Sequence, residues 1–215
     1  MTQRGNRRAD VFLCDADREA YLRFLRTYGQ KRGLAIWAYC LMSNHVHLVA
    51  VPAQETSRSA GLRDAHTVYA MYCNTRTELS GHVWQGRFHS TVLDDAHLWA
   101  AVRYVENNPV RAGMVKRAED YPWSSAAARC SGNDDPVLAD GLPLVKAVED
   151  WRAWLREPFE DEDACYEAIR GHTHTGRPCG APAFVEHLER LTGRPLRPKT
   201  RGPKPGTKYK KRKDS

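Results

Sequence analysis

The sequence lacks the features of secreted, membrane-spanning and disulfide-stabilised proteins. No apolar run approaches the roughly 20 residues that a membrane helix needs, and the opening stretch MTQRGNRRAD has no apolar signal-peptide core. Six cysteines are present, but no two of them form a C-x-x-C pair. Their spacing therefore predicts neither a zinc site nor a disulfide framework. We expect a protein of the reducing cytoplasm that makes no membrane contact.

Acidic residues are missing from most of the C-terminal end. Ten of the residues from Arg194 to Lys213 are Lys or Arg, and no acidic residue appears before Asp214. Prolines and glycines interrupt this run, so we expect residues 193–215 to form a disordered basic tail. Such a tail either remains solvated or supplies phosphate contacts that do not read sequence. The tail residues that we expect to contact phosphate are Lys208, Lys210, Lys211, Arg212 and Lys213.

The hydrophobic pattern predicts a mixed architecture that begins with one main domain. Helical spacing covers residues 15–33, 59–79 and 94–108, and apolar runs typical of strands cover residues 34–42, 45–51 and 83–93, with a short strand near the N-terminus. This order predicts an α+β fold of the ferredoxin-like kind, an antiparallel sheet with its helices on one face. We expect this domain to span residues 1–125. Short helices at 144–155, 160–171 and 183–191 would form a helical extension over residues 126–192.

Two histidines on the second predicted strand point to metal binding. Side chains alternate along a strand, so His45 and His47 share one face while Val46 and Leu48 point into the core. Two imidazoles about 7 Å apart on one strand can hold one cation; the alternative is a pair of histidines on a solvent-facing strand. A second H-x-H, at residues 172–174, follows a helical stretch, and we expect no metal there.

A tyrosine and an asparagine near the end of the predicted helix at 94–108 offer further chemistry. Tyr104 and Asn108 lie four residues apart before Pro109, so they share a helix face. That face lies off the apolar stripe, so we expect the phenol to project beyond the core. The amide oxygen of Asn108, or of its competitor Asn107, could join the two histidines as a third ligand. Imidazole and oxygen donors fit Mg²⁺ or Mn²⁺ when phosphate completes the shell. A tyrosine at the rim of the core and a helix-capping asparagine are the alternatives.

Four motifs in this order resemble the bacterial REP-associated tyrosine transposases. They are the H-x-H pair, W-x-G-R-F at residues 84–88, Y-V-x-x-N-P-V-R-A-G at 104–113 and Y-P-W-S-S at 121–125. These proteins are related to the single-tyrosine transposases of insertion sequences, within the HUH nuclease superfamily. The resemblance covers residues 2 to about 125, and more loosely the T-G-R-P segment at 175–178 and the basic tail. In the resembled family an extended strand precedes T-Q-R-G-N, so either the start has been assigned too late or the sheet lacks most of an edge strand.

The resemblance implies a set of roles for the residues already singled out. His45 and His47 would hold a divalent metal, Mg²⁺ or Mn²⁺, with Asn108 as third ligand, although the insertion-sequence branch usually has glutamine at that position. Tyr104 would attack a phosphodiester of single-stranded or hairpin DNA and form a 5′-phosphotyrosine link that allows later joining. The rivals are a DNA-binding regulator on the same fold and a hydrolase that uses activated water.

Arginines near these motifs are candidates for binding the DNA backbone. Arg4 and Arg7 flank the first strand, Arg87 lies in W-Q-G-R-F, and Arg111 follows the predicted catalytic helix. Arginine side chains are usually exposed, and each of these either contacts a phosphate of the DNA or is an ordinary surface residue. The sequence leaves a monomer and a homodimer open as the active unit.

Overall fold

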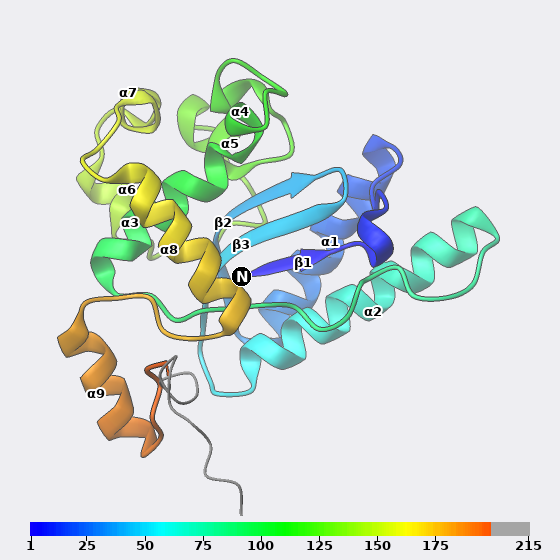
Figure 1. Ribbon diagram of the computed structural model, residues 1–215. Helices are drawn as coiled ribbons and strands as arrows, with labels where there is room; N and C mark the ends of the chain where they lie inside the picture. Colours follow the sequence, from blue (N-terminus) through cyan, green and yellow to red (C-terminus); the bar gives the residue numbers. More distant parts are fainter. Residues whose placement is uncertain (199–215) are drawn as a thin grey trace, which may run out of the picture.

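The computed structural model of the chain describes residues 1–198. A small sheet and a larger number of helices make up this part of the chain (Figure 1). The elements are β1 (Thr2–Arg4), η1 (Asn6–Arg8), α1 (Asp15–Arg32), β2 (Leu34–Met42), β3 (His45–Pro52), α2 (Ser57–Thr77), α3 (Asp95–Glu106), α4 (Asn108–Arg111), η2 (Ala118–Asp120), α5 (Ser125–Ser131), α6 (Leu144–Ala147), α7 (Trp151–Arg156), α8 (Glu162–Thr175) and α9 (Pro182–Thr192).

The sheet places the histidine strand at its centre. Its strand order is β1-β3-β2, and both pairings are antiparallel. A two-residue turn after Met42 reverses the chain from β2 into β3, and His45 is paired with Met42 on one side and with Arg4 on the other. The two predicted strands and the short edge strand are confirmed.

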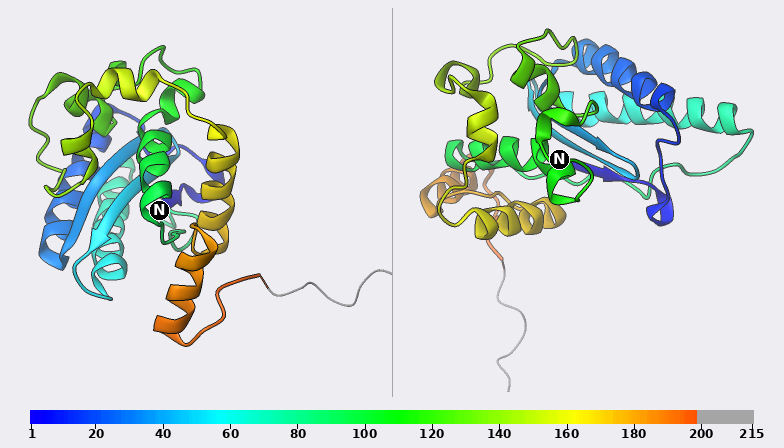
Figure 2. Two further views of the ribbon diagram at one scale, coloured as in Figure 1. Left: turned by 90° about the vertical axis from the view of Figure 1, so that its left-hand side faces the viewer. Right: turned by 90° about the horizontal axis from the view of Figure 1, so that it is seen from above.

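Helices cover both faces of the sheet, which corrects the expectation that they gather on one face. On one face α1 and α2 pack over Ile36, Leu41, Val46 and Leu48. On the other face α3 packs over Cys40 and the neighbouring small side chains, and α8 lies beside α3 (Figure 2). The physical reason is in β2, whose residues 38–42 are all buried, as in a strand covered on both sides. The α+β class itself is confirmed.

The third predicted strand, over residues 83–93, is wrong. The segment runs beside β1 and the residue after it, but its bridges are isolated, Gly5 with Trp84 and Thr2 with His89. Between these bridges β1 advances three residues, from 2 to 5, whereas the segment advances five, from 84 to 89. The two extra residues break the ladder, and the Gln3 side chain instead donates a hydrogen bond to the Gly86 carbonyl over 2.8 Å.

The helices agree with their predicted ranges except where a polar residue or proline divides them. α1 ends at Gly33, whose φ of 66° stops the helix. The predicted helix at 144–155 is two helices, because Asp150 accepts a hydrogen bond from the Ala153 amide and starts α7 anew. Within residues 1–198 no helix is both long enough and apolar enough to cross a membrane.

Candidate active site

A cleft of about 1150 Å³ opens on the α3 face of the sheet. Its walls come from β1, β3, the segment after α2, α3 and α8. His45, His47, Tyr104 and Asn108, the four residues predicted to carry the chemistry, all line it. Val46 and Leu48 point into the opposite core, as the strand alternation predicted.

The two imidazoles lie against each other at the base of this cleft. Their ring centroids are 4.8 Å apart, with the planes at 81°. Nδ1 of His45 lies 2.6 Å from Oδ1 of Asn44. The Asn44 amide nitrogen donates to the Arg8 carbonyl, which leaves Oδ1 as the acceptor and makes Nδ1 of His45 the donor. Nε2 of His45 therefore keeps a free lone pair, the arrangement found when a polar partner orients a metal-binding histidine.

Burial keeps both histidines in the form that binds metals. Burial and, to a smaller extent, the nearby Arg4 guanidinium lower the pKa of His45 to about 4. Burial also holds the pKa of His47 well below its usual value, with His45 as the next cause. Both rings are therefore neutral at pH 7, and a neutral imidazole offers the lone pair that a cation needs.

Tyr104 reaches the cleft from inside the core. The expectation that its phenol projects beyond the core is wrong, because the side chain is only 8% exposed. Its ring stands edge-on to His47, with the centroids 5.6 Å apart, and packs against Tyr166 of α8 at 5.2 Å. The covering side chain comes from a helix 60 residues further along, which helical spacing around Tyr104 alone could not indicate.

The Tyr104 hydroxyl differs from the other buried phenols in having no hydrogen-bond partner among residues 1–198. Six tyrosines are buried, and the other five each hydrogen-bond to a protein group. The Tyr104 oxygen is not among the buried side-chain atoms without a partner, so the cleft keeps it accessible. The Tyr104 hydroxyl is thus left for something that enters the cleft. Burial raises the pKa of Tyr104, whereas the charges of Arg170 and Arg111 oppose that rise.

Asn108, and not Asn107, faces the cleft. The helix is interrupted here: α3 ends at Glu106, and α4 starts at Asn108. The Asn107 side chain turns away and donates a hydrogen bond over 2.8 Å to the Leu155 carbonyl of α7. Within residues 1–198 no three His, Cys, Asp or Glu side chains gather closely enough to hold a metal. The amide of Asn108 lines the cleft together with the two imidazoles, as do the oxygen donors of Gln85, Asp94 and Asp95.

The predicted arginines divide into two groups. Arg4 and Arg87 line the cleft, and sequence reasoning missed Arg8 and Arg58, which line it as well. Across the described ranges, none of these four is ion-paired with a carboxylate. Arg7 and Arg111 are not among the lining residues. The tail lysines and Arg212 lie outside the described residues.

Two features of α8 could not be placed from sequence. His172 and His174 lie within this helix, where positions two apart diverge, so they do not form a pair; His174 instead lies 5.1 Å from the His89 ring. Ile169, Arg170 and Thr173 of α8 line the cleft. Their spacing marks one helix face, but nothing in the sequence says that this face meets Tyr104.

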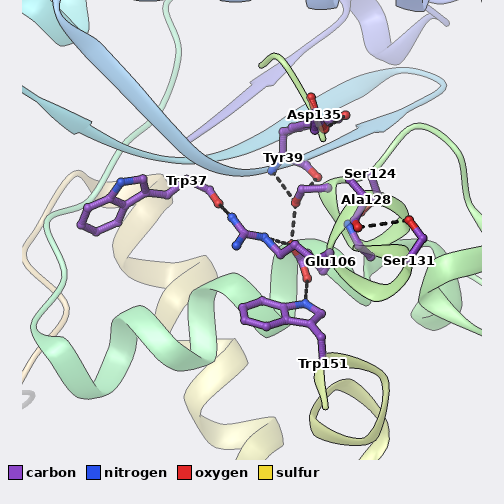
Figure 3. Close-up of polar contacts among 11 residues, drawn as sticks. Trp37, Tyr39, Glu106, Ser124, Ala128, Ser131, Asp135 and Trp151 are labelled. Carbon is purple, nitrogen blue, oxygen red and sulfur yellow. Dashed lines mark hydrogen bonds and ion pairs between the residues drawn. The ribbon is translucent and has the colours of Figure 1, made fainter. Parts of the chain in front are cut away.

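A buried carboxylate holds the end of α3 that carries Tyr104. Glu106 is fully buried and accepts hydrogen bonds over 2.6 Å from the Ser125 hydroxyl and from the Trp151 indole (Figure 3). The Arg129 guanidinium lies 3.2 Å from it and also donates to the Trp37 carbonyl of β2. This network joins α3 to β2, α5 and α7, two residues from Tyr104.

A histidine pair on the central strand of an antiparallel sheet, with a helix-borne tyrosine against it, agrees with the arrangement expected from the resemblance to single-tyrosine transposases. A family model described as "Transposase IS200 like" matches residues 2–108. This segment is therefore similar to that family. A comparison with curated proteins finds no match.

A solved structure of a REP-associated tyrosine transposase bound to a REP hairpin has a similar fold. The TM-score is 0.52, and the two sequences are 20% identical over 66% of this chain and 84% of the other. At that identity the likeness concerns the fold. It agrees with the arrangement of sheet and helices described above.

Proposed function

We propose that the protein nicks and rejoins single-stranded or hairpin DNA through a covalent bond to Tyr104. The observation that carries this proposal is the buried tyrosine that lines a cleft beside two neutral histidines, with no protein partner for its hydroxyl among residues 1–198. The match of residues 2–108 to a transposase family model supports DNA as the substrate. So does the hairpin bound by the neighbour of similar fold.

His45, His47 and Asn108 fit a divalent cation, and we propose that they hold Mg²⁺ or Mn²⁺. The donor set is two neutral imidazoles and an amide oxygen around one cleft, which leaves room for phosphate oxygens and water. When bound, the cation would withdraw charge from the scissile phosphate. Asn44 orients the His45 ring for this role through its side-chain oxygen.

The chain's own part in the reaction is nucleophilic attack. The Tyr104 oxygen bonds to phosphorus, and the bond from phosphorus to the 3′ oxygen breaks. The proton lost by the phenol is balanced by the one gained by the leaving 3′-hydroxyl. The product is a 5′-phosphotyrosine link, and a 3′-hydroxyl can reverse the step without ATP. The unpaired Arg4, Arg8, Arg58 and Arg87 would bind the flanking phosphates.

Trapping of the covalent adduct tests this function. The full chain is incubated with a 5′- or 3′-labelled hairpin and Mg²⁺ or Mn²⁺, and the products are separated on a denaturing gel. We expect the adduct to carry the fragment downstream of the cut through its 5′ phosphate, so that the 3′ label marks the adduct and the 5′ label marks the released strand. Tyr104→Phe should abolish the adduct, because phenylalanine keeps the ring and removes only the nucleophile. Tyr121→Phe, at a buried phenol bonded to the Leu41 carbonyl, is the matched control.

The two rival functions give different results in the same assay. Cleavage that persists in Tyr104→Phe would show a hydrolase that uses water. DNA binding without cleavage by the wild-type protein would show a regulator on this fold. Either result removes the proposal.

A further inference from the structure

We propose that Arg111 and Tyr166 form a clamp that positions the Tyr104 ring for attack, so that α8 is part of the active site. The inference rests on the proposed function in that it concerns the presentation of Tyr104 to DNA. It assigns Arg111 a role different from the phosphate contact expected from the sequence. It also extends the site beyond residues 2–108, the segment that matches the family.

The clamp is defined by three short contacts. The Arg111 guanidinium carbon lies 5.2 Å from the centroid of the Tyr104 ring and 4.6 Å from that of Tyr166. The two tyrosine rings are tilted by 56°, with centroids 5.2 Å apart. A guanidinium within about 6 Å of an aromatic face is attracted to it, so a guanidinium that contacts two rings holds them close to each other. α4 and α8 are thereby joined through the nucleophile.

The contacts of Tyr166 and Arg111 suit a fixed support. Tyr166 is buried, and its hydroxyl donates a hydrogen bond over 2.6 Å to Glu162 of the same helix, which sets the direction of its ring. Arg111 is exposed and makes no ion pair with a carboxylate of residues 1–198. Its charge is therefore free to act on the rings.

The Tyr104 ring needs such support because no hydrogen bond within the described residues fixes its direction. Its hydroxyl makes no hydrogen bond within the described chain, so packing alone fixes the direction of the ring. It lies in the last turn of α3, which ends two residues later at Glu106. His47 meets one edge of the ring, and Arg111 and Tyr166 limit its remaining freedom. An attacking atom displaced by about 1 Å costs roughly 100-fold in rate.

A phosphate contact and a positioning residue predict different kinetics for Arg111. Loss of a phosphate contact weakens DNA binding and lowers the salt slope by about one unit, with little change in rate once DNA saturates the protein. Loss of a positioning residue lowers the rate at saturating DNA and leaves the dissociation constant nearly unchanged. Arg111 does not line the cleft, which favours the second outcome.

The test compares five variants of the full chain, one of them a control, for hairpin affinity and for the rate of adduct formation at saturating hairpin. Arg111→Gln is expected to lower the rate by about 10- to 100-fold, with affinity within about twofold. Arg111→Lys should recover part of the rate, because an ammonium still attracts the ring faces. Tyr166→Leu should lose rate, and Tyr166→Phe, which keeps the ring but loses the hydrogen bond to Glu162, should lose less. Arg190→Gln, on the exposed side of α9, is the control for charge.

A second measurement needs no catalysis and separates this inference from the proposed function. The nine tyrosines are labelled with 3-fluorotyrosine, and Tyr104→Phe identifies the ¹⁹F resonance of Tyr104. Arg111→Gln and Tyr166→Leu should shift or broaden that resonance, while Arg190→Gln should leave it unchanged. An unchanged resonance in Arg111→Gln, or a loss of affinity without a loss of rate, overturns the clamp. If wild type forms no adduct, the proposed function fails and the resonance still decides the clamp.

Discussion

His66 lies in the core on the α1/α2 face, between the rings of Tyr21 and Trp84. Its Nε2 lies 3.0 Å from the Tyr21 hydroxyl, and its side chain is almost fully buried. Burial lowers the pKa of this imidazole to about 3. The folded protein therefore carries His66 neutral at pH values where an unfolded histidine is already charged.

The free energy of unfolding should fall as the pH falls from about 7 to 5.5. In this window the unfolded chain binds a proton at His66 that the folded chain does not, so acid favours unfolding. His66 alone contributes roughly 1 kcal/mol of that loss. Urea unfolding at both pH values should show it, and His66→Gln should have a pH dependence smaller by this amount. An identical pH dependence in the variant would show that His66 does not titrate in this way.

The placement of single side chains was predictable from sequence where a local pattern fixes the direction in which they point. The alternation along β3 placed His45 and His47 together, and motif order singled out Tyr104. Arg58 and Tyr166 were not foreseen, because Arg58 reaches the cleft and Tyr166 reaches the Tyr104 ring from helices whose positions depend on packing between distant segments. Local periodicity says which face of a helix is apolar, but not what that face meets.

At the scale of elements, the strongly patterned segments were predicted and the interrupted ones were not. The helix over residues 15–33 and the strands over 34–42 and 45–51 match the structure within a residue or two. Residues 83–93 have the composition of a strand. They form no ladder with β1, because β1 has only three residues and this segment has two extra residues between its two bridges. The continuous apolar run of β2 was itself a sign of a sheet covered on both faces.

Glu106→Gln should destabilise the packing of α3 against its neighbours. The variant removes a buried charge that Arg129 faces at 3.2 Å and weakens the acceptor for Ser125 and Trp151. We expect a loss of about 2 to 4 kcal/mol in the free energy of unfolding, because Arg129 is left buried without its partner. Urea unfolding measures it. Glu186→Gln, at an exposed ion pair with Arg197, is the control and should change stability by less than about 0.5 kcal/mol.

At the scale of the whole molecule, the domain boundaries and the role of the basic tail remain predictions. Removing residues 199–215 deletes eight Lys or Arg and one acidic residue, Asp214, while keeping Arg197 and its bonds to α9. We expect hairpin affinity to fall and its salt dependence to become shallower, because fewer counterions are released on binding. Titrations at several salt concentrations measure both. Equal slopes for the full and shortened chains would show that the tail does not touch the backbone.

The two cores of the protein draw on different lengths of chain. The buried residues of the α1/α2 core all fall between Val11 and Trp84, whereas those of the α3 core extend from Ala38 to Cys179. A chain emerging from the ribosome can therefore close the first core while α8 is still unmade. Tyr166 can cover Tyr104 only after translation has passed that helix, so an unfinished chain contains Tyr104 without the side chain that packs on it.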